Sequence, residues 1–304
     1  MFAALPGLSS IGIGTNHWGS DGRPDPAMQP VFTAALEAGI TLFDTAEVYG
    51  MGGSERTLGL FLRDGFQPGD SSPKPIVTTK FLPYPWRSAR GGLLAALRRS
   101  LERLNLKRVD LYLIHMPIPP VRIEGWMEGL AEAHAAGLVR AVGVSNFNVG
   151  QTRRAQAALA KRGLSLACNQ VEYSLVKRDV EKNGLLALCR ELNVTLVAYL
   201  PFAAGLLSGK FTPDQPPSGW RRWAISRDAF LRSQPLVALQ RRIGQAHEDK
   251  TPAQVALNWL LCKGALPIPG ATKVQHVREN VGALGWRLDE TEIEALDKAS
   301  EALV

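Results

Sequence analysis

Short runs of apolar, β-forming residues alternate with helix-type patterns along most of this 304-residue chain. This alternation is the signature of repeated βα units around a parallel sheet. Eight such units typically close into a (β/α)₈ TIM barrel, an α/β fold in which one core serves a chain of this length. We therefore expect a single domain over residues 1–304. The eight strands are expected at residues 11–15, 41–44, 76–80, 110–115, 139–144, 166–171, 195–199 and 266–269.

Local signals mark where the helices between these strands begin and end. Gly39 stands where a helix should stop before the second strand, and Pro252 stands where a later helix should start. Asp289 and Glu292 have the spacing of a capping box. The segment 289–303 is therefore predicted to be a closing helix.

One long irregular stretch interrupts the pattern, from Lys210 to Pro235. It is rich in proline, glycine, tryptophan and arginine, and loops of this length in compact domains are often functional. We expect a lid on the C-terminal face of the barrel. A surface insertion without a role in binding is the alternative.

Composition excludes several classes of protein. Lysine and arginine outnumber acidic residues by 35 to 28, but the charges are scattered and no nucleic-acid reader motif accompanies them. No apolar run approaches the roughly 20 residues that cross a bilayer. Cys168, Cys189 and Cys262 form no CxxC pair, which argues against a zinc site or a disulfide framework. We expect a protein of the cytoplasm or the plastid stroma that binds a small molecule and neither nucleic acid nor a membrane. A monomer is expected, with a weak oligomer as the alternative.

Four polar residues stand at or just beyond the ends of predicted strands. Asp44 ends the run ITLFD, Lys80 ends IVTTK, and His115 ends DLYLIH, while Tyr49 follows Asp44 in the loop DTAEVYG. The active site of a TIM barrel gathers at the C-terminal ends of its strands. Because successive strands are neighbours, the second, third and fourth strands should bring these four side chains to one wall.

These residue types suit the reduction of a carbonyl group. A proton must reach the oxygen as hydride reaches the carbon, and the Tyr49 hydroxyl can donate it. We expect the Lys80 ammonium to lower the pKa of Tyr49, and the Asp44 carboxylate to keep that lysine charged. His115 can hydrogen-bond the carbonyl oxygen, provided that its tautomer leaves an N–H in the pocket.

Each of the four also has a structural interpretation. Asp44 and Lys80 would fit an ion pair at the barrel end, His115 a satisfied buried histidine, and Tyr49 a loop aromatic. Their joint placement favours a catalytic site, because the structural explanation would have to hold separately for each. The run GIGTNH lacks the third glycine of a dinucleotide fingerprint, and the chain has no P-loop, HExxH or GxSxG motif.

Seven segments in order resemble the aldo-keto reductase superfamily: FDTAEVYG, TTKF, DLYLIHMP, GVSNF, CNQVEYSL, VAYLPFAAGLLSGK and IPGATKVQHVREN. They cover nearly the whole chain and look most like plant plastid and cyanobacterial members. The resemblance implies that Asp44, Tyr49, Lys80 and His115 are the catalytic tetrad. It also implies direct hydride transfer from NADPH, without a metal, to an aldehyde or ketone.

The resemblance further implies where NADPH or NADP⁺ binds. Ser145, Asn146 and Gln170 match the residues that hold the nicotinamide carboxamide, and Tyr199 matches the aromatic that stacks on the ring. Lys273 matches a partner of the 2′-phosphate, and free N–H groups at the start of the helix after the eighth strand favour an anion. The remaining implied contacts are Gly14, Thr15, Asn16, Asp44, Leu200, Pro201, Phe202, Gly205, Leu206, Ser208, Lys210, Gly270, Thr272, His276, Arg278, Glu279 and Asn280.

Three positions depart from the family pattern. Leu200 replaces a common serine, Asn16 stands where many members carry an aromatic, and His276 stands where many carry arginine. The last change weakens the preference for NADPH over NADH. His17, Trp18, Tyr84, Trp86, Met116 and Trp220 are candidates for the wall of the substrate pocket, with packing in the core as the alternative for each.

Two alternative functions remain open at this point. The first is an NADPH-sensing regulatory subunit with slow turnover, like the potassium-channel β-subunits that form a more distant branch of the superfamily. The second is a phosphate-binding barrel isomerase, which predicts activity without any nicotinamide. The isomerase has little support from the motifs, whereas rapid multiple turnover of NADPH would favour the reductase over the sensing subunit.

Overall fold

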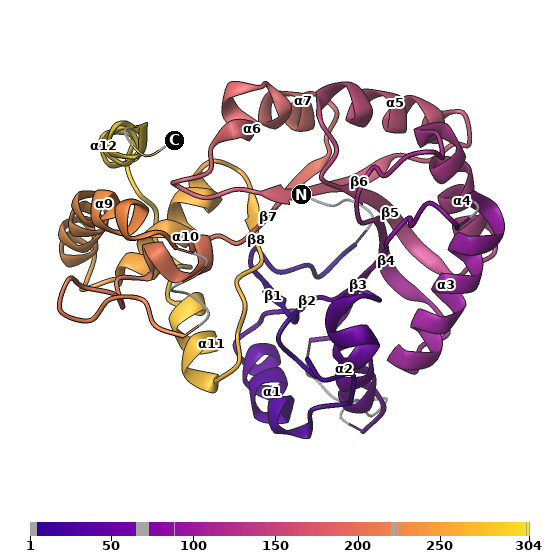
Figure 1. The fold of residues 1–304 in the computed structure, drawn as a ribbon, viewed down its shortest axis with the longest axis horizontal. Helices are drawn as coiled ribbons and strands as arrows, with labels where there is room; N and C mark the ends of the chain where they lie inside the picture. Colours follow the sequence, from indigo (N-terminus) through magenta and orange to yellow (C-terminus); the bar gives the residue numbers. More distant parts are fainter. Residues whose placement is uncertain are drawn as a thin grey trace.

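The computed structural model describes residues 5–64, 73–87, 89–219, 223, 225–301 and 303. Eight parallel strands form one sheet in the order β1 to β8, and Figure 1 shows the helices arranged around it. The Gly14 N–H donates to the Pro269 carbonyl, so the first strand meets the end of the last and the barrel is nearly closed. The expected (β/α)₈ barrel is confirmed. The strands are β1 Gly12–Gly14, β2 Leu42–Asp44, β3 Ile76–Phe81, β4 Val109–Ile114, β5 Val139–Ser145, β6 Leu166–Glu172, β7 Thr195–Tyr199 and β8 Leu266–Pro267.

The helices alternate with the strands, as the sequence pattern predicts. Each of the seven intervals between strands contains at least one α-helix, and two more α-helices follow β8. The α-helices are α1 Gln29–Glu37, α2 Gly53–Asp64, α3 Ala89–Leu104, α4 Ile123–Ala135, α5 Val149–Ala160, α6 Asp179–Lys182, α7 Leu185–Glu191, α9 Arg227–Ala246, α10 Pro252–Cys262, α11 Val274–Val281 and α12 Glu290–Glu301. The 3₁₀ helices are η1 Pro26–Met28, η2 Tyr49–Gly52 and η3 Ala203–Ser208.

The predicted helix boundaries follow from local chemistry. Gly39 follows α1 at φ 78°, a left-handed conformation that glycine adopts without steric cost. Pro252 is the first residue of α10, where its missing N–H is not needed. The Asp289 carboxylate accepts from the Glu292 N–H at 2.8 Å, and the Glu292 carboxylate accepts from the Asp289 N–H at 3.0 Å, so the capping box of α12 is confirmed.

The predicted irregular stretch 210–235 is wrong in its second part. Ser226 accepts a hydrogen bond from the Ala229 N–H and starts α9, which continues through Pro235 to Ala246. The proline misled the prediction, because it usually ends a helix. The helix persists because it buries an apolar face that includes Phe230 and Leu236. Residues 220–222 and 224 lie outside the described residues, so the predicted lid stays a prediction.

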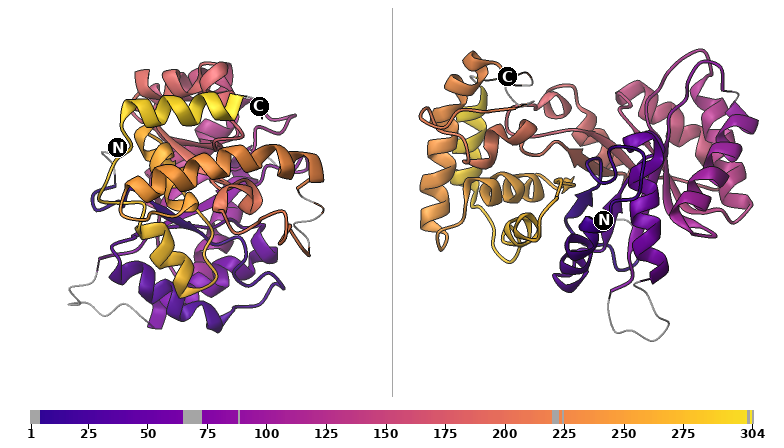
Figure 2. Two further views of the ribbon diagram at one scale, coloured as in Figure 1. Left: turned by 90° about the vertical axis from the view of Figure 1, so that its left-hand side faces the viewer. Right: turned by 60° about the horizontal axis from the view of Figure 1, so that its bottom comes forward.

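The core has two parts, inside and outside the barrel. Alternate side chains of the strands fill the barrel interior with a small apolar cluster that includes Leu42, Leu113 and Val197. A much larger cluster lies between the strands and the helices. Figure 2 shows α9 and α12 packed side by side at one edge of the molecule. None of the helices in the described part of the chain has both the length and the hydropathy to cross a membrane.

Candidate active site

Three neighbouring strands deliver the four predicted residues to one place. Asp44 ends β2, Lys80 lies near the end of β3, and His115 follows β4 directly. Tyr49 opens the 3₁₀ helix η2 in the loop after β2, and its ring lies edge-on to His115 with 5.8 Å between ring centroids. The parallel register places these strand ends at the same edge of the barrel. The structure therefore brings all four side chains together.

The Lys80 ammonium is the centre of this group. It is fully buried and donates to the Asp44 carboxylate at 2.5 Å, to the Thr45 carbonyl at 2.9 Å and to the Tyr49 hydroxyl at 3.3 Å. Three acceptors match the three N–H donors of an ammonium. A buried charge persists only when it is paired and hydrogen-bonded in this way, so the lysine is held as a cation that points at the phenol.

Gln170 completes the group from the other side of the barrel. Its side-chain amide, from β6, donates to the second carboxylate oxygen of Asp44 at 2.8 Å. Sequence reasoning gave Gln170 a role toward the cofactor only. The contact with Asp44 was missed because 126 residues separate the two positions, and no local pattern encodes a contact across the barrel.

The environment of Tyr49 corrects one expectation. Burial raises the pKa of the Tyr49 phenol, Lys80 lowers it through its charge and hydrogen bond, and Asp44 raises it, with a net value above the usual one. The expected net lowering is wrong because desolvation of the phenolate outweighs the nearby ammonium. At neutral pH the phenol is therefore protonated, as a proton donor must be.

Lys80 is charged, whereas His115 is neutral. Burial lowers the pKa of Lys80, but Asp44 and Tyr49 raise it, and the net value is above the usual one. Burial, with help from the Lys80 charge, lowers the pKa of His115 to about 3. His115 is therefore a neutral imidazole at physiological pH. Its buried Nδ1 has no partner within the described residues.

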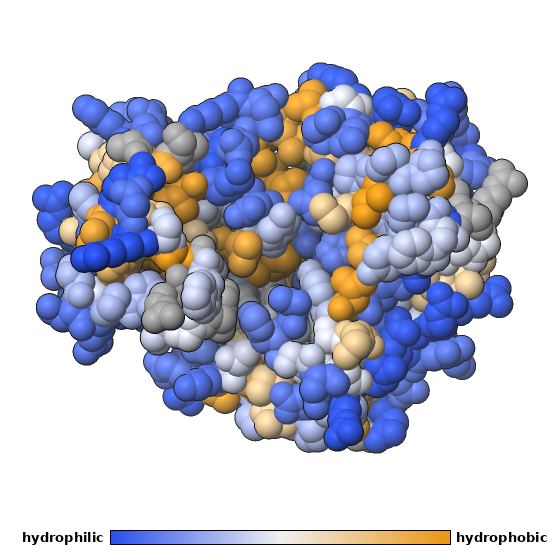
Figure 3. All heavy atoms as spheres, in the orientation of Figure 1, coloured by the Kyte–Doolittle hydropathy of each residue, from blue (hydrophilic) through white to orange (hydrophobic). Residues whose placement is uncertain are grey.

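A cavity of about 920 Å³ opens in front of Tyr49 and His115. Figure 3 shows a hollow with apolar residues near the centre of the molecule. The cavity wall also contains four residues that sequence reasoning missed: Ala204, Phe211, Ala253 and Ile268. The predicted catalytic and cofactor-binding residues that line it are Gly14, Asn16, Asp44, Tyr49, His115, Ser145, Asn146, Gln170, Tyr199, Leu200, Pro201, Phe202, Gly205, Ser208, Lys210, Gly270, Thr272, Lys273, His276, Glu279 and Asn280.

The cavity wall next to His115 is an ordered polar network. The Asn146 amide donates to the His115 carbonyl and to the Ser145 hydroxyl, both at 3.1 Å, and the Tyr199 hydroxyl donates to the Asn146 side-chain oxygen at 2.9 Å. Asn146 adopts φ 62°, which asparagine tolerates better than most residues. These bonds fix the polar edge of Asn146 and the ring of Tyr199 against the cavity.

The far end of the cavity is formed by the loop after β7 and by α11. Lys210 and Glu279 approach each other to 3.6 Å, and Lys273 occupies the N-cap position of α11 without a side-chain capping bond. The side-chain amide nitrogen of Asn280 is buried without a partner within the described residues. An unpaired buried donor is costly and suits a ligand atom that accepts from it.

Some predicted positions lie away from the cavity wall. Thr15 is buried, with its hydroxyl donating to the Asp44 carbonyl, and Leu206 packs in an apolar cluster with Ile225 and Phe230. Arg278 is an exposed residue of α11 and does not line the cavity.

The six expected pocket residues divide into three groups. His17 and Met116 line the cavity. Trp18 does not, because it is fully buried and its indole donates to the Ala271 carbonyl. Tyr84 and Trp86 stack on each other outside the wall, with 4.8 Å between ring centroids, and Trp220 lies outside the described residues.

The fold and this site together define a barrel enzyme of the oxidoreductase class. The sequence model of the family described as "Aldo/keto reductase family" matches residues 10–301 of this chain. The chain therefore belongs to the aldo/keto reductase family, and the resemblance seen in its motifs is confirmed.

Individual relatives agree with this assignment. The chain is 36% identical over 308 residues to a chloroplastic pyridoxal reductase of Arabidopsis thaliana, covering 97% of this chain and 84% of that protein. A solved glycerol dehydrogenase from Gluconobacter oxydans superposes with a TM-score of 0.85 at 27% identity, over 99% of this chain and 97% of that one. An aldo-keto reductase from Klebsiella pneumoniae, solved with NADPH, gives a TM-score of 0.76 at 27% identity, over 96% and 90%.

Proposed function

We propose that this protein reduces an aldehyde or ketone to an alcohol with NADPH, and that Tyr49 gives the proton to the carbonyl oxygen. The observation that carries the proposal is the Lys80 ammonium, which is bonded at once to the Asp44 carboxylate at 2.5 Å and to the Tyr49 hydroxyl at 3.3 Å. A buried cation aimed at a phenol stabilises the phenolate that forms when the proton leaves.

The cavity suits a dinucleotide with phosphate groups. Lys210 and Lys273 supply positive charge at its far end, and the free N–H groups at the start of α11 favour an anion. The unpartnered amide of Asn280 offers a donor, and Ser145, Asn146 and Gln170 offer polar groups beside Tyr199 for a carboxamide. When bound, NADPH supplies the hydride.

The protein's own groups then handle the proton and the position of the substrate. Tyr49 holds a proton at its hydroxyl, because burial keeps the phenol neutral. As that proton moves to the substrate oxygen, the negative charge left on the phenol is stabilised by Lys80. His115 is neutral, so a ring N–H can donate to the same oxygen and orient it without placing a second charge in the site.

The substrate is proposed to be small enough to enter beside His17 and Met116, which line the same cavity as Tyr49 and His115. Pyridoxal is a reasonable first candidate, because a relative that covers nearly the whole chain is a pyridoxal reductase. The test is to follow NADPH absorbance with purified protein and a panel of pyridoxal, aromatic aldehydes and short aliphatic aldehydes. Multiple turnovers with at least one carbonyl support the proposal.

The same experiment separates the reductase from the two alternatives. Tight NADPH binding with no more than one turnover on any carbonyl would favour a cofactor-sensing subunit and refute the reductase. An absence of NADPH binding would refute both and favour chemistry that needs no nicotinamide.

A further inference from the structure

Two buried ion pairs connect the segment of Tyr49 to the segment of Lys80. Glu47 pairs with Arg87 at 2.5 Å, and Glu55 pairs with Arg103 at 2.6 Å. Both carboxylates come from the chain that follows β2, one on each side of Tyr49 in sequence. Both arginines come from the chain that follows β3. The Glu47 and Glu55 side chains are 8% and 0% exposed, so solvent screens these pairs weakly.

The same carboxylates also bind β3 and the residue that follows it, on both sides of Lys80. The Glu55 carboxylate accepts from the Thr79 hydroxyl at 2.6 Å, and the Glu47 carboxylate accepts from the Leu82 N–H at 2.8 Å. Glu55 and Glu47 therefore bind Thr79 and Leu82, one residue before Lys80 and one residue shortly after it. This arrangement fixes the spacing of the two segments at two points.

Arg103 extends the contact to the turn that carries Tyr49. A Cβ at Gly52, the last residue of η2, would lie 2.8 Å from the Arg103 side chain, so Arg103 packs directly against this turn. Gly52 also adopts φ 86°, a conformation that excludes most other residues. Arg87, the partner of Glu47, contacts the segment of Lys80 instead. It donates to the Leu82 carbonyl at 2.8 Å and lies over the Phe81 ring.

We propose that Glu47 and Glu55, locked by Arg87 and Arg103, are positioning residues that set the separation of the Tyr49 hydroxyl and the Lys80 ammonium. Neither carboxylate lines the cavity, so neither acts on the substrate directly. A separation of 3.3 Å lies at the upper end of hydrogen-bond distances, and a small further displacement of the Tyr49 turn breaks the contact. This proposal rests on the proposed function for its kinetic consequences and on geometry alone for its structural ones.

The test uses two double variants that leave no unpaired buried charge: Glu47→Leu with Arg87→Met, and Glu55→Leu with Arg103→Met. Crystal structures of both and of the wild type measure the distance from the Tyr49 hydroxyl oxygen to the Lys80 nitrogen. We expect this distance to increase in both variants. Circular dichroism and a thermal melt establish that each variant is folded.

Kinetics provide a second readout. A displacement of about 1 Å predicts a fall in kcat of roughly 10- to 100-fold, with KM for NADPH unchanged. The groups that face the Tyr49 hydroxyl are Lys80 from β3, Asp44 from β2 and the neutral ring of His115. Lys80 lowers the pKa of Tyr49. A longer distance between the two groups should therefore raise this pKa and move the alkaline limb of the plot of kcat against pH to higher pH. A further variant carries Glu47→Gln, instead of Glu47→Leu, together with Arg87→Met. The glutamine side chain restores an acceptor for the Leu82 N–H, so this variant should recover part of the lost kcat.

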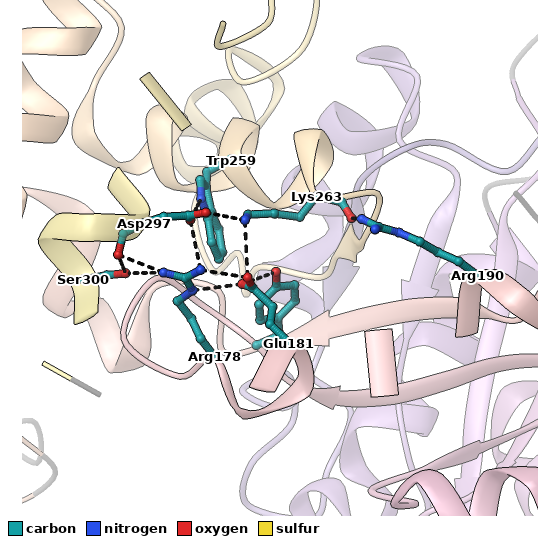
Figure 4. Close-up of polar contacts among 8 residues, drawn as sticks. Arg178, Glu181, Arg190, Trp259, Lys263, Asp297 and Ser300 are labelled. Atoms are coloured by element: carbon teal, nitrogen blue, oxygen red, sulfur yellow. Dashed lines mark hydrogen bonds and ion pairs between the residues drawn. The ribbon is translucent and has the colours of Figure 1, made fainter. Parts of the chain in front are cut away.

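The matched control is Glu181→Leu with Arg178→Met. Figure 4 shows this pair in a network with Lys263, Asp297 and Ser300. The side chains of Arg178 and Glu181 are 11% and 19% exposed, respectively. We expect a loss of stability without a change in kcat or in the Tyr49–Lys80 distance. An unchanged distance in both test variants would overturn the proposal, and so would a longer distance with unmoved kcat and pH profile. If the wild-type protein turns over no carbonyl, the proposed function is refuted. The distance from the Tyr49 hydroxyl to the Lys80 nitrogen then still decides whether Glu47 and Glu55 position these two groups.

Discussion

Replacement of Lys80 by methionine is the change that most directly removes the proposed activation of Tyr49. The ammonium lies 3.3 Å from the Tyr49 hydroxyl, and Coulomb's law at an effective dielectric constant of about 20 gives roughly 5 kcal/mol for a full charge on each. If about half of the negative charge has developed on the phenol in the transition state, the loss is about 2.5 kcal/mol. This corresponds to roughly a 70-fold fall in kcat.

The same substitution also affects stability. The Asp44 carboxylate would lose the ammonium and keep the Gln170 amide at 2.8 Å. Removal of one partner of a buried ion pair typically costs about 3–5 kcal/mol. Urea denaturation should therefore show a large loss for Lys80→Met. It should show a smaller loss when Asp44→Asn is added, because no uncompensated charge remains buried.

The assay combines NADPH absorbance at saturating substrate with NADPH titration by fluorescence. We expect kcat to fall in Lys80→Met and to stay low in the double variant, although the latter regains stability. Lys263→Met is the control, because this lysine also pairs with a carboxylate, Asp297, at 2.5 Å but does not line the cavity. If kcat recovers together with stability in the double variant, Lys80 acts only through the fold and the electrostatic account is refuted.

Three further predictions follow from other parts of the molecule. The folded-state pKa of His115 is about 3, below its unfolded value, so its contribution to stability is present above the unfolded pKa and is lost as the pH falls toward 3. Urea denaturation between pH 7 and pH 4 should show a smaller loss for His115→Gln than for the wild type, and an equal loss would contradict the assigned charge state. Lys273→Glu should weaken NADPH binding and leave NADH binding nearly unchanged in fluorescence titrations, whereas an equal effect on both would argue against a 2′-phosphate contact. Pro235→Ala should stabilise the protein by up to about 3 kcal/mol in a thermal or urea melt, because alanine restores the missing hydrogen bond of α9, and a lower stability would show that the proline is accommodated without strain.

The barrel could be predicted from sequence because each strand is a local apolar run with a polar residue at its end. Asp44, Lys80 and His115 were found by that rule, and their meeting followed from the adjacency of successive strands. Trp18 shows the limit of the same reasoning. It lies close in sequence to the cavity residue His17, but its side chain points into the core, and composition alone does not reveal that direction.

Other features depend on contacts between distant segments. The bond from Gln170 to Asp44 crosses the barrel, and the pairing of Glu55 with Arg103 depends on how two helices pack. The direction of the Tyr49 pKa depends on the degree of burial, which outweighs the charge of Lys80. Neither these two contacts nor the direction of this pKa shift is determined by a local stretch of sequence.

The central claim concerns the proton that Tyr49 holds. Its most direct test is the rate of a single turnover of bound NADPH with Tyr49→Phe and with the wild type, at matched saturation established by fluorescence. Loss of a general acid should slow this step by roughly 10²- to 10⁴-fold while NADPH binding is retained. A Tyr49→Phe protein that oxidises NADPH as fast as the wild type would contradict the account, because the carbonyl oxygen would then receive its proton from another group.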